Sequence, residues 1–201
     1  DLDSFLKDVG DKLKSGWNGF TGNVVLLKQA SPKGIPFDYV MQPCAVHLKY
    51  KGTPWRIIDM EIGHNEIGDA DAFDMVSIPN EISELVDFLC LPKLGNIRIM
   101  KLEYQVAQKL HGATEYRSKR AHDLIDLQLI FSQNEIDLSK TASVCRELFR
   151  YRRKQPWPSV VVKNDNWDVA YANQKDGLNV LPTVDDAIDW TNELIKLIEN
   201  A

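Results

Sequence analysis

The spacing of hydrophobic and polar positions divides the chain into two parts. Leu6, Val9 and Leu13 recur at helical spacing and predict a helix over residues 4–14, which the glycine-containing stretch 16–22 ends. Short stretches rich in β-branched and aromatic residues then predict strands over residues 23–28, 37–41, 45–50 and 55–62. We therefore expect a small antiparallel or mixed sheet with one helix on it.

After Pro92 the pattern becomes helical, and it predicts helices over residues 102–110, 120–131, 139–153 and 184–198. The last of these carries one apolar stripe, which predicts packing in a core rather than ligand binding. Residues 156–177 read as an irregular connection that contains aromatic residues. The fold class is accordingly α+β, with an α/β half over residues 1–100 and a mainly helical half over residues 101–201.

Composition narrows the class of protein. The chain has 201 residues, of which 44% are hydrophobic and 26% charged, as in soluble globular proteins. The sequence has no apolar run long enough for a membrane span and no signal peptide, so we expect a soluble, cytoplasmic protein. Cys44, Cys90 and Cys145 are widely spaced and fit reduced thiols. Because the chain begins at Asp1 without Met, we expect the protein to have residues upstream of it.

The net charge of −5 hides a strong asymmetry. Residues 59–87 contain Asp and Glu but neither Lys nor Arg, whereas residues 140–154 are rich in Lys and Arg and contain Glu147 as their only acid. This segregation suits a protein that holds cations at one place and a polyanion at another. An alternative of equal weight is that both charged segments are merely solvent-exposed surfaces without a ligand.

Two groups of carboxylates could bind a metal ion. At the end of a strand, Asp1 and Asp3 would point to one side with α-carbons about 6.5 Å apart, a geometry that can clamp Mg²⁺. Acids that cap and precede a helix are the simpler explanation for this pair. In the strand expected over residues 55–62, Asp59 and Glu61 lie on the face opposite Ile58. Three or four carboxylates on two strands are what a two-metal nucleotidyl transfer site requires, although acids on a sheet often only face solvent.

The densest pattern of polar residues lies in the helical half. Lys109 sits between apolar neighbours, where a long cation could reach a phosphate or could simply extend to solvent. Asp123 and Asp126 are neighbours on one helix face among apolar residues. Two such acids need a cationic partner, and Arg120 or Lys109 is the evident candidate.

Two strings of the chain match the pattern A-x-K-L-H followed by R-x-(K/H)-D-L-x-D-L; they are residues 106–111 and residues 120–127. This long pattern resembles the signature of the AbiEii-type nucleotidyltransferases, the toxin partners of abortive-infection toxin–antitoxin pairs. Asp1-Leu2-Asp3 resembles the metal motif of that family, and the stretch around Asp59 and Glu61 resembles its third-carboxylate strand. The similarity extends over nearly all 201 residues.

The resemblance implies a polymerase-β-like nucleotidyltransferase sheet followed by a helical half, with an NTP as substrate and Mg²⁺ as cofactor. Asp1 and Asp3 would bind Mg²⁺, and Glu61 or Asp59 would orient a second ion or deprotonate the attacking hydroxyl.

In the helical half, the resemblance implies that Lys109 holds the triphosphate and that Asp123 fixes Lys109 or a basic neighbour. Arg117 and Arg120 are candidates for binding the leaving pyrophosphate. Family acceptors include tRNA 3′ ends and, in some members, proteins, and a cognate antitoxin would be a partner. The basic segment 140–154 would suit RNA phosphates.

Two alternatives to tRNA modification remain. The first is nucleotidyl or phosphoryl transfer to a protein such as the antitoxin, in which case the basic segment 140–154 would be dispensable. The second is a degenerate fold that acts only by binding. The family's glycine-rich turn ahead of its metal motif does not occur in these 201 residues, which favours that second alternative.

Overall fold

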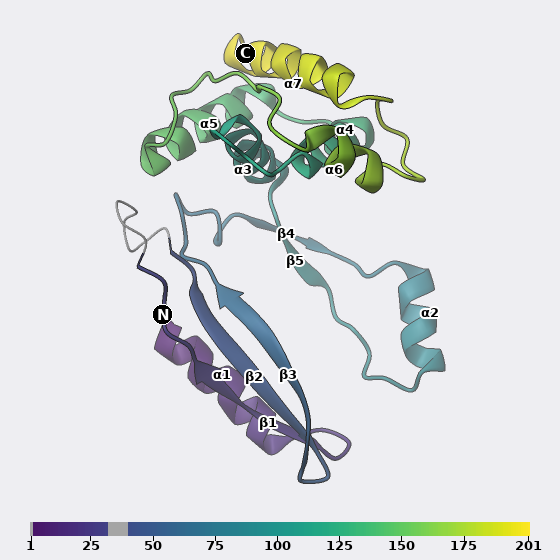
Figure 1. Cartoon of the computed structure of the whole chain (residues 1–201). Helices are drawn as coiled ribbons and strands as arrows, with labels where there is room; N and C mark the ends of the chain where they lie inside the picture. Colours follow the sequence, from purple (N-terminus) through teal and green to yellow (C-terminus); the bar gives the residue numbers. More distant parts are fainter. Residues whose placement is uncertain (1, 32–39) are drawn as a thin grey trace. The chain divides into compact units, whose positions relative to one another are not determined.

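The computed structural model describes residues 2–31 and 40–201 (Figure 1). They divide into two compact units, Asp1–His64 and Asn65–Ala201. Helices and an antiparallel sheet occur together, so the chain has the α+β fold expected from the sequence. The helices that begin at Leu102 share the second unit with a two-stranded sheet and a further helix.

The first unit is a three-stranded antiparallel sheet with one helix beside it. Its elements are α1 (Leu2–Ser15), β1 (Phe20–Leu26), β2 (Gln42–Tyr50) and β3 (Thr53–Ile62), and the strand order is β1-β2-β3. The helix and the antiparallel pairing are confirmed. The strand expected over residues 37–41 falls mainly outside the described residues.

The register of the sheet fixes which residues share a face. Val24 pairs with Val46, which pairs with Ile58, so these residues lie on one face; Asp59 lies on the other, opposite Ala45. A Cβ at Gly22, on the face of Val24, would lie 3.5 Å from Leu13 of α1. The helix therefore packs beside β1, on the side of the sheet that also carries Ile58, and the alternation predicted for the strand over residues 55–62 is confirmed.

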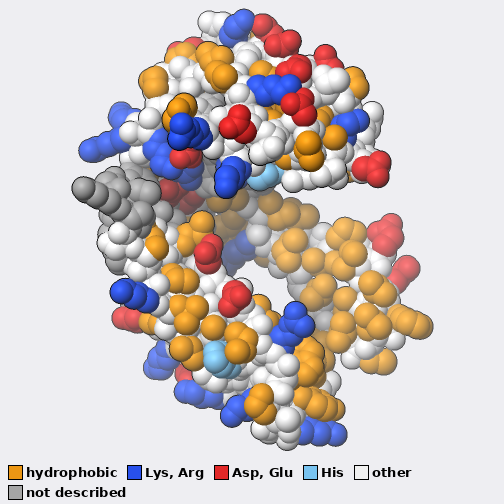
Figure 2. Space-filling model, viewed as in Figure 1, with side chains coloured by type: hydrophobic (Ala, Val, Ile, Leu, Met, Phe, Trp, Pro, Cys, Tyr) orange, Lys and Arg blue, Asp and Glu red, His pale blue; other side chains and the backbone are white. Residues whose placement is uncertain are grey.

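The second unit opens with a segment that the sequence analysis did not anticipate. It consists of β4 (Phe73–Val76), α2 (Asn80–Phe88) and β5 (Ile97–Met100), with β4 and β5 paired antiparallel. Hydrophobic side chains gather over this segment in Figure 2, and Phe88 is 83% exposed. Strands of four residues are too short to show an alternating pattern, and the helix lies where we expected none.

The rest of the second unit is a helical bundle with its own core. Its helices are α3 (Leu102–Thr114), α4 (His122–Gln133), α5 (Leu138–Arg152), α6 (Trp167–Gln174) and α7 (Val184–Glu199). All four predicted helices are confirmed, and α6 lies in the stretch expected to be irregular. The Asp137 carboxylate accepts a hydrogen bond from the Lys140 N–H and so caps α5, and Thr183 caps α7 in the same way.

Large side chains from all five of these helices form one buried cluster. It includes Leu110, Leu124, Leu127, Leu148, Phe149, Trp167, Tyr171 and Ile198. None of the described helices is long and apolar enough to span a membrane. The cysteines are free thiols, with Cys44 and Cys145 buried and Cys90 exposed.

Candidate functional site

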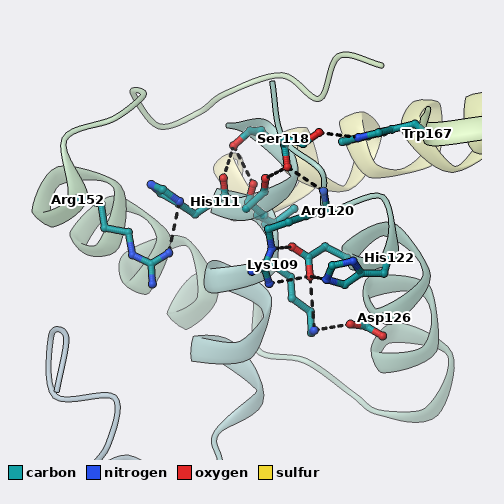
Figure 3. Close-up of polar contacts among 12 residues, drawn as sticks. Lys109, His111, Ser118, Arg120, His122, Asp126, Arg152 and Trp167 are labelled. Carbon is teal, nitrogen blue, oxygen red and sulfur yellow. Dashed lines mark hydrogen bonds and ion pairs between the residues drawn. The ribbon is translucent and has the colours of Figure 1, made fainter. Parts of the chain in front are cut away.

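The Lys109 ammonium meets two carboxylates of the neighbouring helix, α4 (Figure 3). Its Nζ lies 2.5 Å from Asp126 Oδ2 and 3.8 Å from Asp123 Oδ1. Asp123 is fully buried, whereas 21% of the Lys109 side chain and 39% of the Asp126 side chain remain exposed. The predicted pairing of these acids with Lys109 is therefore confirmed, and the lysine keeps access to solvent.

Arg120 binds the buried Asp123 carboxylate in a bidentate contact. Its Nε donates to Asp123 Oδ2 at 2.5 Å and its Nη2 donates to Asp123 Oδ1 at 3.1 Å. This hydrogen bonding raises the pKa of the Arg120 guanidinium, with the Asp123 charge adding to the effect. Because Asp123 is shared between two cations from different parts of the chain, it ties α3, α4 and the turn between them together.

Gly112 makes this arrangement possible, and the sequence analysis assigned it no role. A Cβ at Gly112 would lie 2.5 Å from Arg120 Nε and 2.6 Å from Asp123 Oδ2. The residue is inside α3, where glycine costs about 0.5–1 kcal/mol relative to alanine, so its helical position was the available signal. Only a residue without a side chain lets the Arg120–Asp123 pair approach α3 this closely.

The turn between α3 and α4 is anchored by Ser118, which the sequence analysis also missed. The buried Ser118 hydroxyl donates to the Gly112 carbonyl at 2.6 Å and accepts from the Arg120 N–H at 3.1 Å. The Ser118 carbonyl accepts from Trp167 Nε1 of α6 at 2.8 Å (Figure 3). These bonds hold Arg120 at the place where it can reach Asp123.

His111, next to this cluster on α3, is buried in a cationic environment. Its Nδ1 lies 3.4 Å from Arg152 Nη1, its ring packs edge-on against Phe149, and its Nε2 lacks a hydrogen-bond partner among the described residues. Burial lowers the pKa of His111 to about 3, and the charge of Arg152 acts in the same direction. His111 is therefore neutral at physiological pH and is poorly suited to accept a proton.

Several acids of the stretch 59–87 have partners inside the protein. Glu66 accepts hydrogen bonds from Arg152 Nε at 3.0 and 3.2 Å, and Asp69 accepts from Gln108 Nε2 at 2.7 Å. Burial raises the pKa of Asp69, assisted by the negative charge of Glu66. These two acids are therefore part of the packing of the second unit, which the sequence analysis did not foresee.

The geometry predicted for Asp1 and Asp3 is wrong for the part that is described. Asp3 lies in the first turn of α1 and not at the end of a strand, so strand alternation cannot place the two carboxylates; Asp1 lies outside the described residues. An acid in the first turn is stabilised by the helix dipole, which is the simpler alternative considered above. Strand β3 does present the exposed acids Asp59 and Glu61 on one face.

These residues supply the hard oxygen donors that Mg²⁺ prefers. Among residues 2–31 and 40–201, however, three or more metal-binding side chains do not gather into a group. The predicted metal ligands thus have suitable chemistry, and their convergence stays a prediction.

Most cations of the basic segment 140–154 already have acidic partners. Lys140 Nζ lies 3.0 Å from Glu103, Arg146 Nη2 lies 3.1 Å from Glu199, and Lys154 Nζ lies 2.6 Å from Glu115. Arg152 is bound to Glu66 as described above. The segment offers fewer uncommitted charges to a polyanion than its composition suggests.

Arg117 is not among the contacts that join Lys109, Arg120 and Asp123. It is exposed on the turn before α4 and lines a cavity with the start of α6. The two arginines considered together for pyrophosphate binding therefore have different surroundings, since Arg120 is bound to Asp123 whereas Arg117 lines the cavity near α6.

A family model described as "Nucleotidyl transferase AbiEii toxin, Type IV TA system" matches residues 11–199. The match covers nearly the whole chain, and the chain belongs to this family of nucleotidyltransferase toxins. The matched span includes Asp59, Glu61 and the entire Lys109–Asp126 cluster, and it begins after Asp3. A comparison with curated proteins gave no match.

Proposed function

We propose that this protein transfers a nucleoside monophosphate from an NTP to the 3′ end of tRNA and so blocks translation and growth. The observation that carries the proposal is the family match over residues 11–199, which spans the ordered Lys109–Asp123–Asp126 cluster. In this reaction the acceptor hydroxyl loses its proton, its oxygen bonds to the α-phosphorus, and pyrophosphate leaves with the broken Pα–O bond.

Lys109 is proposed to neutralise the triphosphate. Asp126 and Asp123 orient its ammonium from one side, and the exposed part of the side chain is free to meet a phosphate. Arg120 is proposed to stabilise the charge of the leaving pyrophosphate, while its fork to Asp123 keeps it oriented. The resemblance described above implies the same role for Arg117, but the cavity that Arg117 lines does not include Arg120 and favours another ligand, considered below.

Asp1, Asp3 and either Glu61 or Asp59 are proposed to hold Mg²⁺. When bound, the ion would lower the charge barrier to attack at the α-phosphate. Glu61 or Asp59 could also accept the proton of the attacking hydroxyl, since both lie exposed on one face of β3. The toxin–antitoxin family also supports a cognate antitoxin as partner.

The experiment that tests this proposal measures transfer of a radioactive label from an NTP to tRNA. The purified protein is incubated with Mg²⁺, bulk tRNA and each of the four α-labelled NTPs in turn, and the tRNA is then separated and counted. We expect label in tRNA with at least one NTP, loss of label with EDTA, and loss of label in Asp3→Asn and Glu61→Gln. Asp8→Asn on α1 and Glu84→Gln on α2 are matched controls, because both are exposed acids outside the proposed site.

Each remaining outcome contradicts part of the proposal. Label that enters a protein band instead of tRNA would favour the protein-acceptor alternative. Full activity of Asp3→Asn would exclude the two-metal arrangement. Folded protein that transfers no label from any NTP to tRNA or to protein would support a binding role without catalysis.

A further inference from the structure

A basic cavity lies between the turn that joins α3 to α4 and the start of α6. Its volume is about 670 Å³, within the range of about 300–1,000 Å³ typical of ligand sites. The cations Arg117, Lys119 and Lys163 line it together with one acid, Asp165. Because Lys163 is bound to two further acids, the attraction for an anion rests on Arg117 and Lys119. The cavity does not include Lys109, Arg120 or Asp123.

Two of the three cations are uncommitted. Within the described part of the chain, Arg117 and Lys119 have no carboxylate within 4.0 Å, whereas Lys163 lies 2.7 Å from Asp168 and 3.1 Å from Asp185. This is the reverse of the basic segment 140–154, where most cations are bound to acids. A phosphate that meets Arg117 and Lys119 need not break an ion pair first.

The turn that carries these cations is anchored to α6 by a buried hydrogen bond. Trp167 is 1% exposed, and its bond to the Ser118 carbonyl places α6 directly against the residue between Arg117 and Lys119. Arg117 itself has φ +56°, a left-handed conformation that is unfavourable for a residue with a side chain. Such a conformation persists where surrounding bonds impose it, and here the bonds of Ser118 hold the backbone that carries both cations.

An exposed aromatic ring completes the surface. Tyr116 is 82% exposed, and the Arg117 guanidinium carbon lies 5.2 Å from the centre of its ring. Single-stranded nucleic acids are bound where cations that follow the backbone stand beside an aromatic ring on which a base can stack. A duplex would not present an unstacked base to Tyr116.

We infer that this cavity and Tyr116 bind single-stranded RNA, with Arg117 and Lys119 contacting backbone phosphates and Tyr116 stacking on an unpaired base. The inference rests on the proposed function in taking RNA as the acceptor, and it assigns the RNA contact to residues 116–119 in place of the basic segment 140–154.

The experiment measures RNA binding without chemistry. A fluorescent single-stranded RNA oligonucleotide is titrated with the full chain in EDTA without NTP, and anisotropy is recorded at several salt concentrations. The variants are Arg117→Glu with Lys119→Glu, and Tyr116→Ala alone. The matched control is Arg150→Glu with Arg153→Glu, which reverses two exposed charges on and just after α5. Thermal unfolding by circular dichroism verifies that each variant is folded.

We expect the Arg117/Lys119 variant to bind at least about tenfold more weakly, with the log–log salt slope reduced by about 1.4, since each single-strand phosphate contact contributes about 0.7. Tyr116→Ala should weaken single-stranded RNA by roughly tenfold. It should leave a blunt RNA duplex of the same sequence unaffected. The Arg150/Arg153 control should stay within about twofold of wild type.

Two results would overturn the inference. Equal weakening by both double variants would indicate general electrostatic attraction, and weakening by the α5 variant alone would assign RNA to the segment 140–154. Because the readout is binding, the two proposals fail separately. Protein that binds RNA through residues 116–119 but transfers no label contradicts the proposed function alone.

Discussion

The helical bundle and the N-terminal sheet bury their side chains to very different extents. The bundle has a continuous core to which every helix from α3 to α7 contributes. In the described part of the sheet unit, the buried apolar residues are Cys44, Ala45 and Val46, while Trp55 is 58% exposed and Ile57 is 59% exposed. The candidate functional residues thus lie in two different environments, one tightly packed and one open to solvent.

Because of this difference, substitution of an acid should have different consequences for stability in the two regions, even where the acids have similar proposed roles. In the bundle, Asp123 is both a candidate functional group and a fully buried link between α3, α4 and their turn. On β3, Asp59 and Glu61 lie exposed and contribute little to packing. Loss of an acid should therefore cost folding stability in the first region and activity alone in the second.

The largest effect is expected at Asp123. Asp123→Ala leaves Arg120 without its two-pronged partner and Lys109 with one acid instead of two. Because half of the Arg120 side chain is exposed, the charge left behind stays hydrated, and the main cost is loss of the charge-assisted hydrogen bonds to Asp123. We expect the free energy of unfolding, measured by urea titration, to fall by about 3 kcal/mol.

Asp126→Asn is the matched control, because 39% of the Asp126 side chain is exposed, and it should cost no more than about 1 kcal/mol. Equal stabilities for the two variants would show that Asp123 is not a structural link, and the contrast between the regions would disappear.

A smaller effect is expected from pH through His111. The pKa of His111 falls from 6.5 in the unfolded chain to about 3 in the folded one, so His111 binds a proton more tightly in the unfolded state. The stability due to neutral His111 is thus complete above pH 6.5 and decreases as pH falls toward 3. At pH 5 the loss should be about 2 kcal/mol.

The measurement compares urea titrations at pH 7.5 and pH 5 for wild type and His111→Gln. Glutamine keeps an acceptor for Arg152 but does not titrate in this range. The difference between the two pH dependences should equal about 2 kcal/mol. Identical pH dependences would show that His111 is readily protonated in the folded bundle.

How far the sequence could predict these two regions depended on the length of each pattern. The long apolar stripes predicted helices that the structure confirms, and the need of Asp123 for a cation correctly indicated Arg120 and Lys109. The short strands β4 and β5 were missed because four residues carry little periodicity.

The misplacement of Asp3 has a different cause. A pair of acids separated by one residue fits both a strand end and a first helical turn, and local sequence cannot decide between them. The roles of Gly112 and Ser118 were also beyond prediction, since they depend on how closely the Arg120–Asp123 pair approaches α3.

A moderate effect is expected from Gly112→Ala. The added Cβ would overlap Arg120 Nε and Asp123 Oδ2, and Arg120 can move away only by losing its two hydrogen bonds to Asp123. The overpacking cost of about 1–3 kcal/mol is partly offset by the gain in helix propensity of about 0.5–1 kcal/mol, so we expect a net loss of about 1 kcal/mol. Gly10→Ala on α1, where a Cβ would meet nothing within 4 Å, is the control and should be neutral or stabilising.

The smallest effect on stability is expected at the exposed face of β3. Asp59→Asn and Glu61→Gln remove charge but little volume from exposed positions, so the free energy of unfolding should stay within about 0.5 kcal/mol of wild type. If these carboxylates hold a cation or accept a proton, transfer of label to tRNA should nevertheless fall by at least about 10²-fold in one of the two variants, as general acid–base catalysis alone contributes that much. Label transfer and urea titration on the same preparations separate the effects. Loss of stability in parallel with activity would mean that β3 depends on its acids for folding, as α4 depends on Asp123, and the two regions would then differ in exposure but not in kind.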